Sequence, residues 1–344
     1  MDFHSFFKDK KIIVFGGTGS IGSEIVNQLL KLEPRVIRIF CNSENELWES
    51  KMRLKDQVEN LRFLLGDVRN KERVYTALNN IDLVFNAAAV KHVPISEYNP
   101  MEAIDVNIKG VENIIKGSQI QGVEKMIHIS TDKAVDPTTV MGATKLLSER
   151  LCMSRSSYQS TGLVISCVRF GNVLGSRGSI IPLIKQQIRR GEHVTLTSSH
   201  MRRFFMSIND AADLVLKAMT LARGGEMFVL KMPVIKIKDM IEVIIENYAP
   251  KVGKDPSKIK IQEIGPRPGE KLNEALLTEI EYDHCFETEE MFAIYSPISY
   301  PHLKFVPSER IGQKIKNDLD YSTKNIEQIS KREIKKMLMS CGLL

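Results

Sequence analysis

The sequence has few of the features that mark secreted, metal-binding or membrane proteins. Five cysteines occur in 344 residues, at positions 41, 152, 167, 285 and 341, and none forms a C-x-x-C pair. This spacing favours reduced thiols over disulfides, and we expect no metal site. No apolar run approaches the ~18 residues that span a bilayer, and the N-terminus lacks the pattern of a signal peptide. We therefore expect a cytoplasmic protein that does not bind membranes.

The sequence also lacks a strong excess of charge of either sign. The 48 Lys+Arg and 42 Asp+Glu residues leave a net charge of +6, without basic clusters. This argues against a nucleic-acid partner but is compatible with a small anionic substrate. An apolar fraction of 43% excludes disorder. The single tryptophan, Trp48, is expected to pack within the second helix and to carry no chemistry.

From residue 11 to about 170, apolar strands alternate with amphipathic helices. We expect strands at 11–15, 36–40, 62–65, 82–85, 125–130 and 163–168, and helices at 21–31 and 100–121. Such alternation predicts an α/β fold with a Rossmann-like, doubly wound parallel sheet. Ligands of these sheets bind at the carboxyl ends of the strands.

A glycine-rich turn, Gly16-Gly17-Thr18-Gly19-Ser20-Ile21-Gly22, lies directly between the first strand and the first helix. It satisfies both G-x-G-x-x-G and G-x-x-G-x-x-G, in the strand–turn–helix context that a dinucleotide site requires. The glycines permit a tight turn and a close approach of the backbone to a pyrophosphate. We expect cofactor contacts from Gly16, Thr18, Gly19, Ser20, Ile21 and Gly22.

The end of the second strand favours NADP as the cofactor. NAD-binding proteins usually carry an acid there, but this sequence has Cys41 and Asn42. Asn42 and Ser43 could donate to a 2′-phosphate, whereas Glu44 could still reach the ribose, which leaves NAD as the alternative. Further expected cofactor contacts are Asp67, Val68, Ala87, Ala88, Ala89 and Asn107. Close packing alone would also explain the three alanines.

After residue 172 the pattern is less regular, with helices expected at 208–223, 237–248 and 331–339. We expect residues 1–171 to form the dinucleotide-binding domain, which the chain rejoins for part of 200–232. Residues 172–302 would form mainly a substrate-binding lobe. Residues 303–344 would be a C-terminal tail that packs on its own subunit or on a neighbour.

Two short motifs are expected to carry the chemistry. Thr131-Asp132-Lys133 follows an apolar strand and should lie at the carboxyl edge of the sheet, facing the cofactor. Met141-Gly142-Ala143-Thr144-Lys145 then opens a helix, and its lysine would point back over the nicotinamide ribose. The alternative for Asp132 and Lys133 is a local surface ion pair.

Several unusual motifs occur together with these. They are Lys91-His92-Val93-Pro94, the run from Arg169 to Ser179, the run from Met201 to Met206, and Arg267-Pro268-Gly269-Glu270-Lys271-Leu272. Over residues 10 to 280 the chain thereby resembles the UDP-N-acetylglucosamine 4,6-dehydratases of bacterial and archaeal polysaccharide and flagellin-sugar biosynthesis. These belong to the extended branch of the short-chain dehydrogenase/reductase superfamily.

The resemblance implies roles for the catalytic residues. Lys133 would be the base for the C5 proton and Asp132 the acid for the departing hydroxyl. Met141 stands where the superfamily has a catalytic tyrosine, and a thioether cannot take a proton. Some dehydratases of this family also resemble the chain in having methionine there. Thr131, assisted by Lys145, is then the candidate that deprotonates the 4-hydroxyl.

The resemblance also implies a substrate site and an assembly. Asn172 and Ser179 would bind the diphosphate, Arg203 and Arg267 would clamp a phosphate or ribose, and Glu270 would accept from the uridine ribose. Lys91 and His92 would lie over the sugar, although His92 could equally be a packed imidazole. Family members form homo-oligomers, so a dimer or hexamer is expected.

Three alternatives remain open. A dehydratase could invert C5, which we favour, retain it, or release the 5,6-ene. A UDP-sugar 4-epimerase or reductase shares the fold, but it would need the tyrosine that Met141 replaces. A relative that binds nucleotides without turnover would have no use for the Asp132-Lys133 pair.

Overall fold

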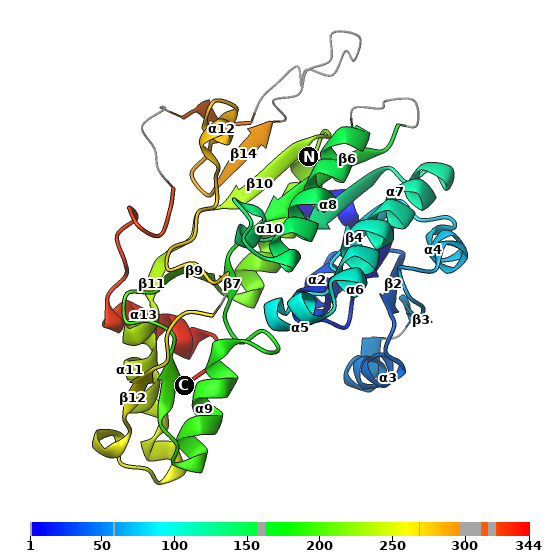
Figure 1. Ribbon diagram of the computed structural model, residues 1–344. Coiled ribbons are helices and arrows are strands. Elements are labelled where there is room, and N and C mark those ends of the chain that lie inside the picture. The colour runs from blue at the N-terminus through cyan, green and yellow to red at the C-terminus, as the bar shows by residue number, and fades with distance from the viewer. Residues whose placement is uncertain (1, 58, 157–161, 268, 296–310, 316–320) are drawn as a thin grey trace.

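A large, mostly parallel sheet runs through the molecule (Figure 1). The computed structural model describes residues 2–57, 59–156, 162–267, 269–295, 311–315 and 321–344. Within these ranges the strand order is β15-β13-β14-β10-β6-β5-β4-β1-β2-β3. The parallel strands are β1 (Lys11–Phe15), β2 (Val36–Cys41), β3 (Leu61–Leu65), β4 (Leu83–Asn86), β5 (Lys125–Ile129), β6 (Val164–Arg169) and β10 (Glu226–Leu230).

This topology confirms the predicted fold class. The order β3-β2-β1-β4-β5-β6 is that of a doubly wound dinucleotide-binding sheet, with its switch point between β1 and β4. Each of the six predicted strands is present with its ends shifted by no more than one residue. The register aligns Phe15 with Phe40 on one side and with Asn86 on the other. The loops that follow β1, β2 and β4 therefore meet at one edge.

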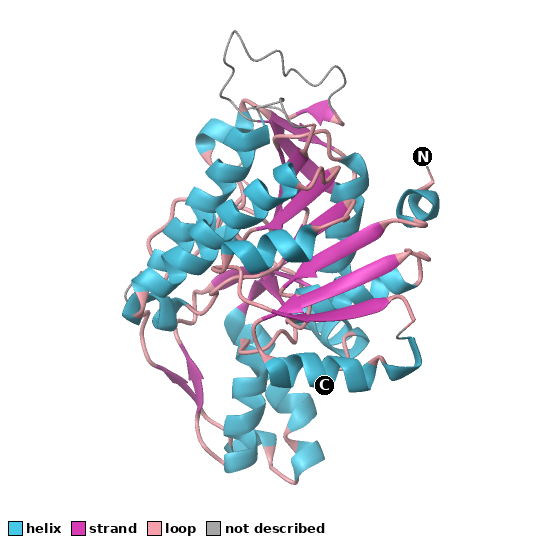
Figure 2. Ribbon diagram, turned by 90° about the vertical axis from the view of Figure 1, so that its right-hand side faces the viewer, coloured by secondary structure: helices cyan, strands magenta, loops and turns pink. Residues whose placement is uncertain are grey.

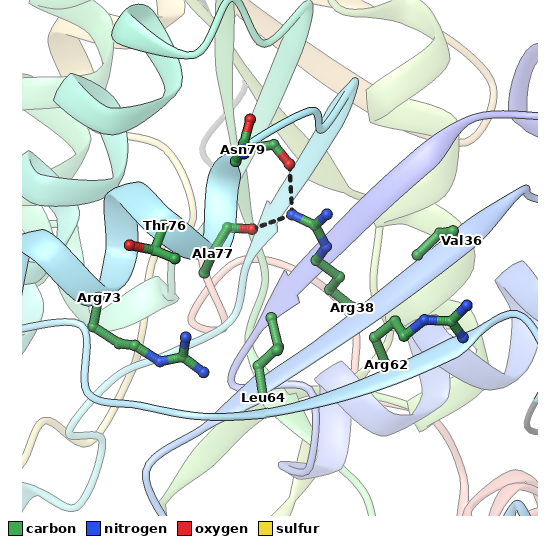
Figure 3. Close-up of a pocket in the computed structure, with 8 residues that line it drawn as sticks. All are labelled: Val36, Arg38, Arg62, Leu64, Arg73, Thr76, Ala77 and Asn79. Atoms are coloured by element: carbon green, nitrogen blue, oxygen red, sulfur yellow. Dashed lines mark hydrogen bonds between the residues drawn. The ribbon is translucent and has the colours of Figure 1, made fainter.

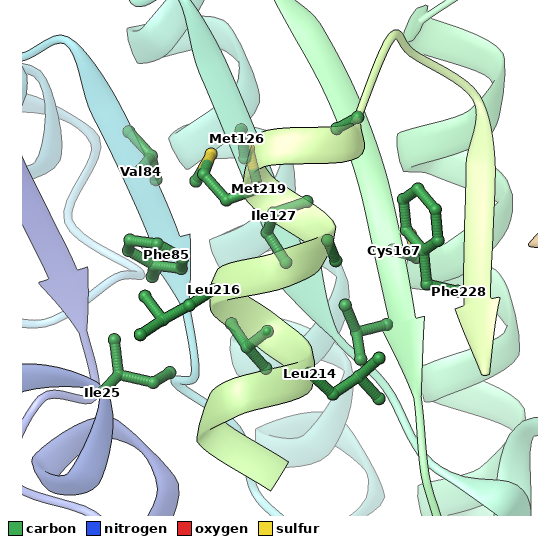
Figure 4. Packing of buried hydrophobic residues seen from close by; sticks show 14 of the residues in the cluster. Ile25, Val84, Phe85, Met126, Ile127, Cys167, Leu214, Leu216, Met219 and Phe228 are labelled. Carbon is green, nitrogen blue, oxygen red and sulfur yellow. The ribbon is translucent and has the colours of Figure 1, made fainter. Parts of the chain in front are cut away.

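Helices cover both faces of the sheet (Figure 2). On one face α1 (Phe3–Phe7) and α2 (Ser20–Leu30) pack with α10 (Ile208–Leu221). On the other lie α4 (Lys71–Leu78), α7 (Gly110–Ile120) and α8 (Val140–Ser156). A capping box between Ser207 and Asp210 starts α10. Its apolar face, with Leu216 and Met219, packs against Phe85 and Met126 of the sheet (Figure 4).

Helices near the edge of the site differ in part from the prediction. The single helix expected at 100–121 is divided into α6 (Pro100–Ile104), a π-helical turn η2 (Asp105–Lys109) and α7. Shorter elements are η1 (Lys55–Gln57), α5 (Val93–Tyr98), η3 (Asp132–Ala134), η5 (Pro250–Val252), η6 (Pro256–Lys258) and α12 (Glu279–Tyr282). The packing expected for Trp48 is wrong: on α3 (Glu44–Arg53) its side chain is 60% exposed, because the helix turns Leu47 and Ser50 inward.

Three antiparallel strands extend the large sheet beyond β10. They are β14 (Met291–Tyr295), β13 (Cys285–Glu287) and β15 (Gln313–Lys314). The first two fall in the range expected to form mainly the substrate lobe, yet they pair with the dinucleotide-binding sheet. All five residues of β14 are buried, so its side chains belong to the main core.

A second apolar core lies below the carboxyl edge of the sheet (Figure 1). It contains α9 (Ile180–Arg190), α11 (Ile237–Tyr248), α13 (Lys331–Ser340) and the paired strands β8 (Val194–Leu196) and β12 (Ile261–Glu263). A small sheet of β7 (Asn172–Val173), β9 (Arg202–Met206) and β11 (Val234–Lys236) joins the two cores. Ile334 and Leu338 of α13 are fully buried in this second core. No helix among the described residues is long and apolar enough to cross a membrane.

Candidate active site

The glycine-rich turn packs too closely for side chains. Gly16 has φ +70°, and a Cβ there would lie 2.8 Å from the backbone of Ala87. A Cβ on Gly22 would lie 2.2 Å from the Gly16 carbonyl oxygen. Gly19 is the N-cap of α2 and provides no side-chain hydrogen bond to that helix end. The first turn of α2 therefore keeps backbone N–H groups for a ligand, with Ser20 and Ile21 beside them.

A carboxylate lies at the end of β2, although the sequence shows none at the expected positions. Glu46 Oε2 accepts the Thr18 hydroxyl at 2.6 Å and lies 3.8 Å from Cys41 Sγ. The other oxygen, Oε1, accepts from the Arg177 guanidinium at 2.6 Å. Glu44, the acid considered in the sequence, is exposed. Glu46 thus brings negative charge to the side of the site where a dinucleotide carries its adenosine ribose.

Arg177 reaches this place from the loop between β7 and α9. Its guanidinium also donates to the Thr18 carbonyl oxygen at 2.9 Å, and its backbone N–H donates to Ser20 Oγ at 3.0 Å. The loop therefore spans the glycine turn and α3. In the sequence Arg177 belongs to one of the unusual motifs, but only its long-range contacts show that it lies at the glycine turn.

The residues expected around the adenosine lie together. Asn42 is exposed, and the pKa of the nearby Asp67 carboxylate is lowered mainly by its hydrogen bond to Arg69. Ser43 is the N-cap of α3 and accepts the Glu46 N–H, which leaves its own O–H free to donate. Val68 is buried.

Small side chains line the next strand end. The Ala87 N–H donates to the Phe15 carbonyl oxygen at 2.9 Å, so residues 87–89 continue alongside the glycine turn. Asn107 lies in the π-helical turn and is 1% exposed. Its amide bonds both backbone groups of Val90 and donates to Thr144 Oγ1 at 3.0 Å. Asn107 therefore holds the strand-end loop against α8.

Thr131, Asp132 and Lys133 form a connected group directly after β5. Asp132 Oδ1 accepts from the Thr131 hydroxyl at 2.8 Å and from Lys133 Nζ at 2.9 Å. The Asp132 side chain is fully buried, whereas that of Lys133 is 29% exposed. Asp132 Oδ2 is buried without a hydrogen-bond partner among the described residues. One carboxylate oxygen is thus held and the other is available.

The start of α8 is fixed against this group. A Cβ on Gly142 would lie 2.3 Å from the Lys133 carbonyl oxygen. Met141 is 3% exposed and lies one turn before Lys145, so both face the same side of the helix. Burial lowers the pKa of Lys145 to about 8. Its Nζ donates to the Ile129 carbonyl oxygen.

Two of the motifs that we expect to bind the substrate contact each other. Lys91 Nζ donates to the Arg177 carbonyl oxygen at 2.9 Å, and its pKa is lowered by burial and then by the Arg177 charge. A Cβ on Gly178 would lie 2.3 Å from His92 Cε1. His92 is otherwise exposed, so it is not a packed core imidazole. The Lys91-His92 segment and the 176–179 loop therefore form one wall.

The residues expected to bind the diphosphate lie at the start of the second lobe. Asn172 Nδ2 donates to the Phe204 carbonyl oxygen at 3.2 Å. Ser179 is the N-cap of α9, yet its hydroxyl makes no capping bond, and Ser179 Oγ is buried without a partner among the described residues. An unpaired hydroxyl beside uncapped N–H groups suits an anion.

Arg203 does not present an open guanidinium. It is 7% exposed, and it donates to the backbone carbonyls of Arg202, Lys271 and Leu272 while lying 3.7 Å from Glu274. Arg203 is therefore not the free clamp for a phosphate or ribose that was expected from the sequence. It binds the segment that carries Glu274. Burial, and next the charge of Asp132, raise the pKa of Glu274. Glu274, a functional candidate that the sequence did not indicate, therefore interacts electrostatically with Asp132.

The motif from Arg267 to Leu272 docks on the segment after Asp132. Thr138 Oγ1 donates to the Gly269 carbonyl oxygen at 2.7 Å, and Lys271 Nζ donates to the Val135 carbonyl oxygen at 3.1 Å. Glu270 Oε2 accepts the backbone N–H of Arg267 at 3.2 Å, so it shapes this turn. The Arg267 side chain is exposed, and Pro268 lies outside the described residues.

A separate cavity lies away from these residues, over β2, β3 and α4 (Figure 3). Its volume is about 350 Å³ and its walls include Arg38, Arg62 and Arg73. Arg38 Nη1 donates to the carbonyl oxygens of Ala77 and Asn79 at 2.6 and 2.7 Å. This arginine therefore closes the carboxyl end of α4, and the cavity takes no part in the site.

The fold and the glycine turn define a Rossmann-type nucleotide-binding enzyme fold. Residues 12–296 match the family model of the polysaccharide biosynthesis protein family, and the chain belongs to that family. An uncharacterized membrane protein of Methanocaldococcus jannaschii is 50% identical over 344 residues, covering 100% of this chain and 99% of that protein.

Other relatives have assigned activities. A UDP-N-acetylglucosamine 4,6-dehydratase (inverting) of Campylobacter jejuni is 37% identical, covering 93% of this chain and 94% of that protein. A UDP-glucose 4-epimerase of Rickettsia prowazekii is 36% identical, covering 97% and 96%. Among solved structures, Pen from Bacillus thuringiensis superposes with a TM-score of 0.92 at 42% identity, covering 98% of this chain and 99% of that one. The dTDP-glucose 4,6-dehydratase DesIV of Streptomyces venezuelae, with NAD bound, shares the fold, with a TM-score of 0.67 at 20% identity, covering 76% and 86%.

Proposed function

We propose that the chain is a UDP-N-acetylglucosamine 4,6-dehydratase, a lyase that inverts C5 and forms a UDP-4-keto-6-deoxy-HexNAc for surface polysaccharide or flagellin-glycan synthesis. The observation that carries this proposal is the Asp132–Lys133 pair after β5, at the same sheet edge as the dinucleotide turn after β1, with Asp132 Oδ2 lacking a hydrogen-bond partner among the described residues. The Campylobacter jejuni relative supports the substrate. A cytoplasmic homo-oligomer, dimer or hexamer, would fit this function, and light scattering would measure its size.

The residues around the glycine turn fit a nicotinamide dinucleotide, because the turn packs without room for a Cβ at Gly16 or Gly22 and leads into the uncapped N-terminus of α2. We favour NADP, with Asn42, Ser43 and Arg177 as donors to a 2′-phosphate. Glu46 is the residue that would favour NAD. A bound nicotinamide would supply hydride transfer, the chemistry needed to oxidise C4 of the sugar and to reduce C6.

Side chains of the protein would carry out the proton transfers of the reaction. Lys133, 29% exposed, removes the C5 proton, and buried Asp132 donates a proton to the departing C6 hydroxyl. Thr131, assisted by Lys145, deprotonates the 4-hydroxyl. Two protons leave the sugar, from O4 and C5, and two are given back, to the leaving hydroxyl and to C5. The reaction therefore loses water without net oxidation.

The substrate would lie between the two lobes. Ser179 and Asn172 would bind the diphosphate, Lys91 and His92 would face the sugar, and Arg267 would reach the nucleotide. Arg203 and Glu270 shape this wall from behind through their contacts with the chain itself.

Incubation of the purified protein with UDP-N-acetylglucosamine in D2O, followed by proton NMR, tests the proposal. A C6 methyl signal with deuterium at C5 is expected, and ring couplings distinguish inversion from retention. A vinyl signal would indicate release of the 5,6-ene. Unchanged substrate in the presence of NADP or NAD would overturn the lyase assignment.

The Rickettsia prowazekii relative makes 4-epimerisation the second candidate. An epimerase needs an acid–base group at the place of Met141 and no Asp–Lys elimination pair. Formation of UDP-N-acetylgalactosamine, unaffected by Lys133→Ala, would favour the epimerase. Loss of all product in that variant, with binding retained, would favour the dehydratase.

A further inference from the structure

A buried chain of hydrogen bonds runs from the β4 strand end to the catalytic helix. Asn86 Oδ1 accepts the Ala88 N–H at 3.2 Å, which leaves the amide NH2 group of Asn86 facing His128 Nδ1 at 3.1 Å. Nδ1 must then accept, so the proton of neutral His128 resides on Nε2. Asn86 is 1% exposed and His128 is fully buried. The amide thereby fixes the tautomer of the imidazole.

The Nε2–H of His128 points at two groups. Ser148 Oγ lies at 3.0 Å and accepts, since its own O–H donates to the Lys145 carbonyl oxygen at 2.8 Å. Lys145 Nζ lies at 3.2 Å. An ammonium group has only donors and cannot accept from Nε2–H, whereas an uncharged amine can. The donor and acceptor directions of these hydrogen bonds therefore disfavour the charged form of Lys145.

We propose that Asn86 and His128 are positioning residues that bias Lys145 toward its uncharged amine, so that Lys145 itself takes the proton of the sugar hydroxyl, in place of the missing tyrosine and of Thr131, whose hydroxyl already donates to Asp132 Oδ1. This inference rests on the proposed function and names its least defined step. The O–H bond of the 4-hydroxyl breaks, an N–H bond forms at Nζ, and a carbonyl forms as C4 loses its hydride to the nicotinamide.

The other groups facing Lys145 are consistent with this role. Glu149 on the same helix would favour the charged form, but its two oxygens are bound by Arg169 at 3.1 and 2.8 Å. Ser130 also donates to that carboxylate. Cys152 and Cys167 are the remaining titratable neighbours. Burial lowers the pKa of His128 well below its usual value, with a smaller contribution from the Lys145 charge, so the imidazole stays neutral.

The isosteric variant Asn86→Asp reverses the donor and acceptor directions of these hydrogen bonds. A carboxylate accepts from Nδ1–H, and Nε2 then becomes an acceptor for the Lys145 ammonium. We expect the pKa of Lys145 to rise by about one unit or more. It is measured by 15N NMR of the lysine Nζ groups, with the signal assigned from its loss in Lys145→Arg. In a pH series, the rising limb of kcat should shift upward by the same amount while KM changes little.

Further variants separate positioning from folding. Asn60→Asp is the control. It loses an amide donor to the Pro34 carbonyl oxygen, far from the hydrogen bonds around His128, and should leave the Lys145 titration unchanged. Ser148→Ala leaves Nε2–H to Lys145 alone and should lower its pKa. His128→Gln keeps an N–H donor and should restore most of the rate that His128→Leu loses.

The two proposals fail in different ways. If Asn86→Asp and Ser148→Ala, folded as judged by circular dichroism, both titrate like the native chain, the inference is overturned whatever the enzyme turns over. If the wild type leaves UDP-N-acetylglucosamine unchanged but the Lys145 pKa shifts as expected, the positioning role stands and the proposed substrate fails.

Discussion

Gly142 and the Lys133 carbonyl oxygen approach so closely that a Cβ on Gly142 would lie only 2.3 Å from that oxygen. The first turn of α8 therefore rests directly on the backbone of Lys133, in the group expected to be catalytic. Because Met141 and Lys145 belong to this helix, the distance between the two chemical motifs is fixed by a residue that has no side chain.

Gly142→Ala should displace η3 from α8. We expect kcat to fall by about 10²-fold, because small displacements of catalytic groups are costly. The unfolding free energy should fall by about 1–3 kcal/mol, as for other overpacked sites. Gly253→Ala is the control: no atom lies within 4 Å of its Cβ, but its φ of +69° is strained, so it loses stability away from the site. Equal rates in both variants would contradict this role of Gly142.

Asp132→Asn should separate two steps of the reaction. The amide cannot protonate the departing hydroxyl, so we expect formation of the C6 methyl group to fall by about 10²–10⁴-fold. Exchange of the C5 proton by Lys133 should continue in D2O. NMR of recovered substrate measures both. Loss of exchange together with elimination would show that Asp132 does not act as the acid alone.

Glu46→Gln should change the preference between the two dinucleotides. Removing the carboxylate that faces Thr18 and Arg177 removes repulsion from a 2′-phosphate and frees the guanidinium. We expect the ratio of NAD to NADP dissociation constants to rise about tenfold, equivalent to roughly 1.4 kcal/mol. Fluorescence titration of the apoprotein measures both constants. Arg177→Ala should move the ratio in the opposite direction.

Arg169 ties α8 to α12 inside the core and should matter for stability at neutral pH. Its guanidinium, which is 2% exposed, binds Glu149 and Glu281. Arg169→Met leaves two buried carboxylates unpaired, and we expect a loss of about 3–5 kcal/mol at pH 7, measured by denaturant unfolding.

The pH dependence of that loss follows from Glu281. Burial works against its charge, but Arg169 lowers its pKa below the ordinary glutamate value. The stabilisation is therefore present above a pH of about 4.3 and is lost as the pH falls through the lowered native pKa. The difference between Arg169→Met and wild type should narrow below pH 4. A constant difference down to pH 3 would contradict this.

Local patterns in the sequence were enough to predict the sheet and the glycine turn. Apolar strands and Gly16–Gly22 are short-range signals, and each predicted strand lies where it was expected. The groups that follow β5 could be predicted for the same reason, since a strand end fixes the sheet edge. Their grouping in the structure agrees with that expectation, whereas their catalytic roles remain predictions.

Contacts between distant segments could not be predicted from local patterns. Glu46 lies within a helix, and its contacts with Thr18 and with Arg177, which is 131 residues away, place it at the site. The sequence predicts a ligand-binding cation at Arg203, but its guanidinium donates to the backbone carbonyl oxygens of Lys271 and Leu272. His128 reads as one polar residue in an apolar strand, and its partners on β4 and α8 become visible only in the fold.

Helix α13 delays completion of the second lobe during synthesis of the chain. Ile334 and Leu338 complete an apolar core whose other members begin at Leu174. During synthesis, the β1–β6 half of the large sheet can emerge and pair while that core still lacks one wall. The apolar core of the second lobe therefore becomes complete only after residues 331–340 have left the ribosome, when strands β1–β6 are already available to pair.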